Sequence, residues 1–311
     1  MKFKIITGLL SCIFFMDGCT VPTPKTITVE STTVSTEQNP FYTESSLYMK
    51  YPEFDKIKNK HYTPAFEKGM ADHMAEIDAI AERADSPTLE NTIISMEKSG
   101  ALLDRVATVF FALTSANTND EMEKIRSEMA PKLSAHSDQI LLNGKLFHRV
   151  KTIYEQRDQL GLDKESKRLV EKYYTDFIRS GANLSSEEKE SLKKINGEMA
   201  VLQTTFSQNV LKEVNALAVV VDSKDELDGL SDAAIEAAAN EAKSRELDGK
   251  YVLTLRNTSG QPPMASLTNR ALRERIHKTS LSRGSRGGDF DNRNILANVI
   301  KLRAEKAQLM G

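Results

Sequence analysis

The sequence predicts a mainly α-helical protein with a small two-stranded β element near residues 217–255. Three observations lead to this prediction. Apolar residues recur every three or four positions through most of the chain, which is the period of one helix face. Residues that favour helix N-caps stand before several of these stretches. Only two short runs, 217–221 and 251–255, are instead dominated by β-branched and apolar residues, as strands that pair with each other would be.

Size and composition narrow the class of protein. A chain of 311 residues suffices for one large or two ordinary domains. A hydrophobic content of 40% with 28% charged residues is typical of a soluble globular protein. The formal net charge of −2 provides no field that would attract nucleic acid, and the absence of Trp argues against a base-stacking surface. We therefore expect no nucleic-acid partner.

The N-terminus resembles an export signal. Two lysines precede an apolar stretch at 5–16, which is too short to span a bilayer, so residues 1–18 are predicted to be a signal peptide. Gly18-Cys19 resembles the lipobox of bacterial lipoproteins, which predicts lipidation at Cys19, and export to the periplasm without a lipid is the alternative. The expected location is the cell envelope, either periplasmic or lipid-anchored to a bacterial membrane.

The residues that follow divide into a tether and a body. Residues 19–38 are rich in Thr, Ser, Val and Pro, which predicts a flexible tether rather than a core-forming segment. The only cysteines, Cys12 and Cys19, precede the body, so it offers no thiol for a disulfide, a metal or a nucleophile. Residues 39–311 are predicted to form the folded helical part.

The first helices of the body are predicted from caps and apolar period. Thr63 is expected to be the N-cap of a first helix, with Pro64 at its first position. A second helix is expected from about 87 to 115. Asn119-Asp120 should cap a third helix, which Pro131 should kink or split.

The remaining helices follow the same reasoning. Two segments, 145–160 and 164–180, precede a capping box formed by Ser185 and Glu188, which opens a long amphipathic helix. Its expected inward residues are Leu192, Ile195, Met199, Leu202, Phe206 and Val210. Ser231 should cap a helix between the two strands. Two more helices are expected near 264–280 and 290–309, the last with an apolar stripe of Ile295, Val299, Leu302 and Leu309.

No catalytic constellation is found in the sequence. None of the five histidines has the His-Glu-x-x-His spacing of a helical zinc site. His73 and Glu76 share one helix face and offer two ligands without a third, so His73 is interpreted as an ordinary surface or interface residue. No Gly-x-Ser-x-Gly elbow occurs, and Ser259-Gly260 is expected in a turn. We therefore predict neither catalytic nor metal-binding residues within these 311 positions.

The arginine- and glycine-rich stretch 270–293 has some features of an anion site. Six arginines and three glycines recur there, and backbone N–H groups of such a loop can contact anions. No Gly-Lys-Ser/Thr follows, which excludes a Walker loop. The favoured interpretation is a structural turn with ion pairs on the helix surface, and the alternative is a loop that contacts polypeptide or carboxylate.

Several long segments resemble a known family. Residues 54–70, 90–120, 130–143, 146–185 and 266–293 are similar to the N-terminal half of bacterial peptidyl-dipeptidases (dipeptidyl carboxypeptidases), in the thimet-oligopeptidase family of zinc metallopeptidases. The SANTND stretch at 115–120 and the RGSRGG turn at 283–288 favour this branch over oligopeptidase A. The resemblance extends over about residues 39–311.

The resemblance implies a fold and an activity. It implies a multi-helix array that forms one wall of a peptidase channel, while a C-terminal half binds zinc through His-Glu-x-x-His and a further Glu. The full-length enzyme would remove C-terminal dipeptides from short peptides. The metal site is expected downstream of Gly311, so this chain alone is expected to bind no zinc and to be inactive. The alternatives are a non-catalytic, peptide-binding helical lipoprotein and a fragment that is unstable without its other half.

Overall fold

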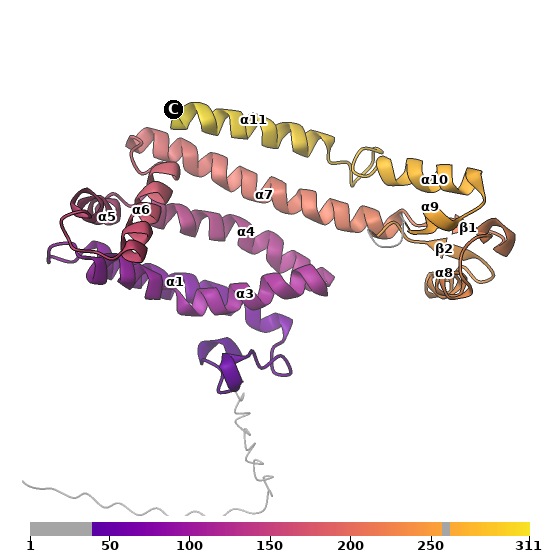
Figure 1. The fold of residues 1–311 in the computed structure, drawn as a ribbon, viewed down its shortest axis with the longest axis horizontal. Helices are drawn as coiled ribbons and strands as arrows, with labels where there is room; N and C mark the ends of the chain where they lie inside the picture. The colour runs from indigo at the N-terminus through magenta and orange to yellow at the C-terminus, as the bar shows by residue number, and fades with distance from the viewer. Residues whose placement is uncertain (1–38, 257–261) are drawn as a thin grey trace, which may run out of the picture. The chain divides into compact units, whose positions relative to one another are not determined.

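The computed structural model describes residues 39–256 and 262–311, and this part of the chain is mainly helical with one two-stranded sheet (Figure 1). The long helices are α1 (Tyr62–Ala81), α3 (Ala101–Ala116), α4 (Asp120–Leu141), α5 (Gly144–Gln156), α6 (Lys164–Arg179), α7 (Ser186–Ala216), α8 (Asp232–Ser244), α10 (Arg270–Leu281) and α11 (Arg293–Met310). The short elements are α2 (Ser95–Lys98), α9 (Pro262–Ser266), β1 (Val219–Val221) and β2 (Tyr251–Leu253). The predicted fold class is confirmed. The predicted signal peptide, the tether, Cys19 and Ser259-Gly260 lie outside the described residues.

The strand pair forms as predicted, although it is shorter than the apolar runs. β1 and β2 are antiparallel, with Val220 opposite Val252 in the register. No helix in residues 39–256 and 262–311 is long and apolar enough to cross a membrane.

Local capping explains where several helices begin. The Asn119 side chain accepts a hydrogen bond from the Met122 amide, which opens α4. Ser185 and Glu188 cap each other's backbone at the start of α7, and Ser231 caps α8. These caps satisfy amides that have no partner within the helix, which is why the sequence predicts them correctly.

The predicted start of the first helix is wrong by two residues. α1 begins at Tyr62, so Thr63 lies inside the helix and is not the N-cap. A 3-10 turn at Asn59–His61 leads directly into α1. The Lys58 amide donates to His61 Nδ1 at 3.1 Å, which caps this 3-10 turn, and α1 continues from it without a side-chain cap of its own.

The predicted helix at 87–115 is also interrupted. A π-helical turn at Leu89–Ile94 and α2 end at Lys98, and α3 begins only at Ala101. Gly100 has a φ of +75°, which breaks the helix, and its amide donates to Glu76 Oε2 on α1 at 2.7 Å. This hydrogen bond to another helix stabilises the break.

Two further boundaries differ from the prediction. The helix expected at 264–280 is divided into α9 and α10, because Asn269 starts a new helix by accepting from the Leu272 amide at 3.1 Å. α4 runs from Asp120 to Leu141 through Pro131, so of the two expected effects of this proline, a kink or a split, the split does not occur.

Three apolar clusters form the core. One joins α1, α5, α6 and the π-helical turn, and it contains Ile77, Ile93, Leu146, Val150, Ile153 and Phe177 among others. A second joins α1, α3 and α4, and it contains Tyr62, Phe66, Val106, Phe110, Met122 and Met129. The Phe66 and Phe110 rings of this cluster meet edge to face, 5.3 Å apart. A third surrounds the strands, α8 and α10, and it contains Val219, Val221, Leu227, Leu253, Leu272 and Ile276.

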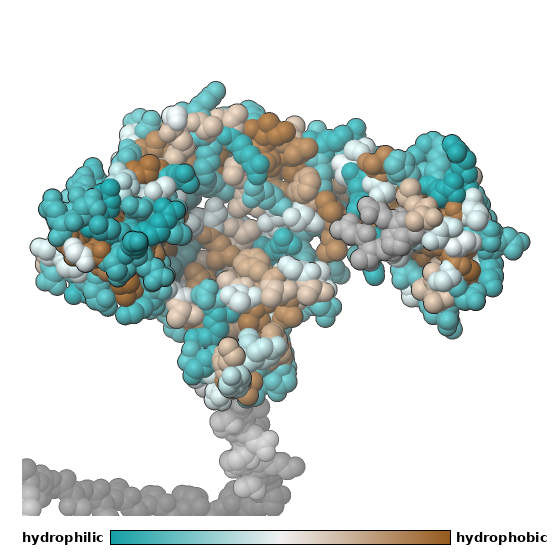
Figure 2. Space-filling model, viewed as in Figure 1, coloured by the Kyte–Doolittle hydropathy of each residue, from teal (hydrophilic) through white to brown (hydrophobic). Residues whose placement is uncertain are grey.

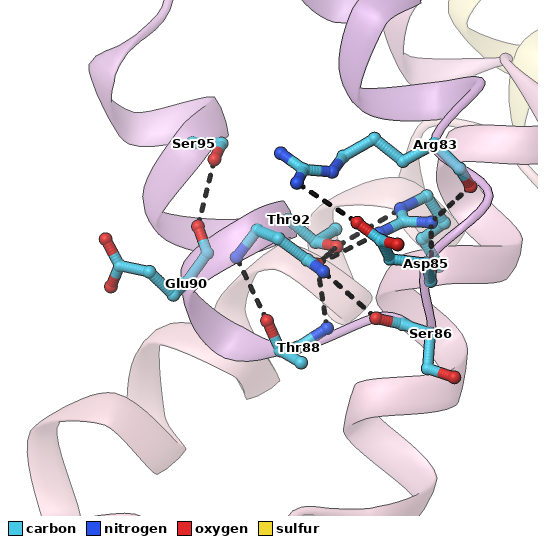
Figure 3. A network of polar contacts seen from close by, with 9 residues as sticks. Arg83, Asp85, Ser86, Thr88, Glu90, Thr92 and Ser95 are labelled. Atoms are coloured by element: carbon cyan, nitrogen blue, oxygen red, sulfur yellow. Dashed lines mark hydrogen bonds and ion pairs between the residues drawn. The ribbon is translucent and has the colours of Figure 1, made fainter.

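A buried arginine fixes the connection between α1 and the π-helical turn. Arg149 on α5 is only 4% exposed. Its Nη1 donates to the carbonyls of Arg83 and Asp85 at 3.0 Å each, its Nε to Thr92 Oγ1 at 3.2 Å, and its Nη2 to Asn91 Oδ1 at 2.9 Å. Figure 3 shows the connecting segment around these acceptors, with the Arg83 guanidinium directed at the Asp85 carboxylate. One side chain from α5 therefore sets the path of this loop.

α7 is long but shallowly buried. It packs against α4 and against α11, yet only Leu192 and Glu213 of its 31 residues are buried. The predicted inward stripe is therefore only partly right, since Phe206 is 37% exposed. On α11, Val299 and Leu302 of the predicted stripe are buried, and Ile295 and Leu309 are half-buried.

Candidate functional site

Two grooves border α7, and both are also lined by α4 and α11. The apolar groove has a volume of about 630 Å³ and is lined by Pro131, Gly197, Glu198, Val201, Leu202, Asn298, Lys301, Leu302 and Glu305. The polar groove has a volume of about 310 Å³, and its polar lining residues are Ser134, Ser137, Asp138, Arg179, Ser180, Asn196, Gln203 and Lys306. Figure 2 shows hydrophobic residues gathered over part of α11.

A chain of polar contacts crosses the polar groove. Asp138 on α4 is 8% exposed, and its Oδ1 accepts from Asn196 Nδ2 on α7 at 2.7 Å. Lys306 Nζ on α11 donates to Asn196 Oδ1 at 2.8 Å. Asn196 therefore links a carboxylate and an ammonium group that come from two different helices.

The titration of Asp138 reflects this environment. Burial raises the pKa of the Asp138 carboxyl, because a charged form is disfavoured away from water. The Asn196 hydrogen bond and the nearby Lys306 offset part of this shift. The groove thus presents a carboxylate, an ammonium group and amides to a polar ligand such as a polypeptide backbone. It offers no activated nucleophile.

A second polar cluster joins α1 to α4 through two histidines. His73 Nδ1 lies 2.9 Å from His136 Nε2, and His73 Nε2 lies 3.1 Å from Ser99 Oγ. Because the Ser99 hydroxyl donates to the Met96 carbonyl at 2.7 Å, Ser99 accepts from His73 Nε2–H. In neutral His73, Nδ1 is then the acceptor and His136 Nε2–H is the donor. Burial lowers the pKa of both imidazoles, which is consistent with a neutral pair.

The pair of His73 and Glu76 singled out in the sequence does not come together as a ligand set. Glu76 accepts from the Gly100 amide, whereas His73 contacts His136. Of the two positions predicted for His73, surface or interface, the structure shows the interface, between α1 and α4. Across residues 39–256 and 262–311, no group of three or more His, Cys, Asp or Glu side chains has a geometry suited to a metal ion.

The arginine- and glycine-rich turn is a structural element, as the favoured interpretation predicted. Its Gly284 amide donates to the buried carboxylate of Glu213 on α7. The Gly287 amide donates to Asp291 at 2.7 Å, and Arg293 forms an ion pair with the same carboxylate at 2.6 Å. The Gly284 and Gly287 amides, which could otherwise donate to an external anion, therefore bind carboxylates of the chain itself. The turn fastens the start of α11 to α7.

Sequence reasoning missed both polar clusters. Asp138 and Asn196 are 58 residues apart, and His73 and His136 are 63 apart. No short motif connects positions at such separations, because the contacts depend on how two helices pack side by side.

Comparisons with known proteins give the relationship of the chain. Dipeptidyl carboxypeptidase of Escherichia coli is 40% identical over 276 residues, which is 89% of this chain and 40% of that protein. Dipeptidyl carboxypeptidase of Salmonella typhimurium is 39% identical over 273 residues, with 88% and 40% covered. Oligopeptidase A of Salmonella typhimurium is 27% identical over 277 residues, with 88% and 40% covered. No family model matches the chain.

These matches confirm the resemblance predicted from the sequence. The identity to the dipeptidyl carboxypeptidases exceeds the identity to oligopeptidase A, as SANTND and RGSRGG suggested. The chain spans about two fifths of the length of these relatives. Over nearly nine tenths of its own length, it is similar to peptidases of the dipeptidyl carboxypeptidase and oligopeptidase A type.

Proposed function

We propose that this chain forms one part of a zinc-dependent peptidyl-dipeptidase, an enzyme that removes C-terminal dipeptides from short peptides. The observation that carries the proposal is the 40% identity over 276 residues to a dipeptidyl carboxypeptidase. The lower identity of 27% to oligopeptidase A favours the dipeptide-releasing activity over that of a general oligopeptidase.

The described residues do not fit a zinc site, since they form no group of three suitable ligands. We therefore assign zinc and the groups that act on the peptide bond to the part of the relatives that this chain does not span. The role left for the described residues is to contact peptide along the grooves beside α7. The polar groove supports this role because Asp138 and Lys306 present opposite charges within one depression.

We also propose that the protein works in the cell envelope. The lysines and apolar stretch within residues 1–18 support export, and Gly18-Cys19 supports a lipid anchor. Labelling of the expressing bacterium with a fatty-acid analogue tests this. The chain should carry the label, and Cys19→Ser should abolish it. Labelling that survives the substitution would contradict the anchor.

Activity is tested with the chain alone and with a chimera. In the chimera, this chain replaces the 276 matched residues of the Escherichia coli dipeptidyl carboxypeptidase. We expect neither stoichiometric zinc nor dipeptide release from the chain alone, and zinc-dependent dipeptide release from the chimera. Turnover by the chain alone would overturn the proposed division of roles. A folded, zinc-loaded chimera without dipeptide release would overturn the proposed activity.

The contribution of the polar groove is tested in the same chimera. Lys306→Met removes the ammonium group of the groove, whereas Lys278→Met removes an exposed lysine on α10 whose side chain is 73% accessible. The first substitution should raise KM for peptides with little effect on kcat, and the second should change neither. Equal kinetics for both variants would remove the groove from the peptide path.

A second candidate is a peptide-binding protein without catalysis. The two grooves beside α7 favour it, because they are concave surfaces available without any further chain. Calorimetry of the chain with short peptides distinguishes the two candidates. Tight binding by the chain alone, together with an inactive chimera, would favour the binding protein.

A further inference from the structure

The first described segment carries an exposed apolar protrusion. Within residues 47–54, here called the strap, five apolar side chains are exposed. Their exposed fractions are 46% for Leu47, 87% for Tyr48, 80% for Met49, 62% for Tyr51 and 44% for Phe54. Such a density of exposed large apolar residues is typical of an interaction site rather than of a solvated loop.

Both sides of the strap are fastened to the second apolar cluster. Before it, Phe41 is buried and its carbonyl accepts from Arg105 Nη1 at 2.5 Å, while Asn39 Nδ2 donates to the His61 carbonyl at 2.8 Å. After it, Ile57 packs against the same cluster. The strap is therefore held at a defined place on the helical body.

The backbone of the strap adopts a conformation that ordinary residues avoid. Met49 and Lys50 have φ values of 53° and 59°, in the left-handed region. The Lys50 amide donates to the Leu47 carbonyl at 2.9 Å, and the Tyr51 amide to the Tyr48 carbonyl at 3.2 Å. This tight turn directs Tyr48 and Met49 outward, since both are at least four fifths exposed. Among the described residues, no other part of the chain covers these two side chains.

The charges around the strap favour a protein partner over a lipid surface. Lys50 pairs with Glu44 at 3.1 Å, and Lys56 pairs with Glu53 at 2.6 Å. The two lysines are thereby balanced, so the strap offers no excess positive charge to anionic headgroups. Tyr and Met are enriched in protein–protein interfaces, where they fill apolar pockets.

The length of the relatives points to the partner. Because the chain spans about two fifths of their length, a further three fifths of polypeptide exists in those enzymes. We propose that the strap is a docking element that inserts Tyr48 and Met49 into an apolar pocket of that remaining, zinc-bearing part of the peptidase. This inference rests on the proposed function and deepens it by naming the residues that join the two parts.

The experiment compares the free chain with the chimera described above. Hydrogen exchange of residues 47–54 should be at least about tenfold slower in the chimera than in the free chain, because docking buries the strap. Tyr48→Ser combined with Met49→Ser should lower the Tm of the chimera and leave the Tm of the free chain unchanged. The matched control is Leu281→Ser at the end of α10, where the side chain is 70% exposed, and it should act equally on both proteins.

The outcomes separate this inference from the proposed function. Dipeptide release with a strap that exchanges as fast as in the free chain overturns the docking and leaves the activity standing. A protected strap without dipeptide release overturns the proposed activity and leaves the docking standing. Protection of the strap in the free chain, through self-association or on phosphatidylcholine and phosphatidylglycerol vesicles, overturns the assigned partner. If the chimera does not fold, exchange is measured on the chain mixed with the separately expressed part, and a lack of protection there overturns the docking.

Discussion

Arg149 offers the sharpest test of how the helical body is held together. The substitution Arg149→Met keeps most of the aliphatic length of the side chain and removes every N–H donor. Four oxygen acceptors then lose the Arg149 donor, namely the Arg83 and Asp85 carbonyls and the side chains of Asn91 and Thr92. Asn91 Oδ1 keeps two other donors, the Thr88 amide and the Thr92 hydroxyl. The change therefore addresses the hydrogen bonds and the charge with little change in volume.

The expected magnitude follows from which acceptors water can reach. A hydrogen bond to a charged group contributes about 1.5–3 kcal/mol. Arg83 and Asp85 lie in an exposed loop, so water replaces the lost donor there. Thr92 is fully buried, so its lost bond is not replaced, whereas Asn91 is half-buried and keeps two other donors. Partial recovery at Asn91 leaves an expected loss of about 3 kcal/mol in the free energy of unfolding, or roughly 6–12 °C in Tm.

Urea denaturation followed by circular dichroism measures this loss. The midpoint should fall while the m-value stays constant, because the folded surface is unchanged. Arg149→Lys should lie between the wild type and the Met variant, since lysine keeps the charge but loses the fork of donors. The matched control is Arg168→Met on α6, whose side chain is 80% accessible and which should cost less than about 0.5 kcal/mol. A loss below about 1 kcal/mol for Arg149→Met would refute the assignment of the clamp.

Three further predictions concern the same body. Burial lowers the pKa of His73 and His136, so the unfolded chain binds more protons than the folded chain at mildly acidic pH. The free energy of unfolding, measured by urea titration, should therefore fall as the pH drops below about 6.5. His136→Gln should flatten this fall, whereas substitution of an exposed histidine should not. Gly100→Ala should lower the free energy of unfolding by about 2–4 kcal/mol, because the new Cβ would lie 3.0 Å from the His73 ring. Gly249 has a similar positive φ but open space around it, so Gly249→Ala should cost only about 1 kcal/mol. Equal melting temperatures for the two variants would contradict the steric clash with His73. Asp138→Asn should not reduce stability at neutral pH, because burial raises the pKa of the carboxyl and thus disfavours its charged form. The amide oxygen of the new residue still accepts the hydrogen bond from Asn196. A loss above about 1 kcal/mol in urea denaturation would show that the charge itself is needed.

The parts of the fold that the sequence predicts well depend on neighbours within about four residues. The capping box at Ser185 and the Asn119 cap are of this kind. The interruption at Gly100 is different, because the amide there binds Glu76, 24 residues earlier and on another helix. The apolar period continues across the break, so period alone predicts one helix where two form.

The candidate site was less accessible to sequence reasoning than the fold. The polar groove requires that Asp138, Asn196 and Lys306 meet from three helices, and each residue alone resembles a solvated position. The peptidase relationship, in contrast, was recognisable because long segments resemble the relatives directly. The strap was missed, because its apolar residues fit the ordinary expectation of a core segment until their exposure is known.

The shallow burial of α7 has a consequence for cooperativity. At 1.5 Å per residue its 31 residues extend about 46 Å, and the third apolar cluster follows its C-terminal end. That cluster shares no buried residue with the other two. A connection that buries only two side chains couples the stability of the two parts weakly. The strands, α8 and α10 should therefore unfold as a unit of their own under native conditions. Unfolding of the chain then takes place in more than one transition, and the fall in midpoint expected for Arg149→Met belongs to the transition of the helices around the first apolar cluster.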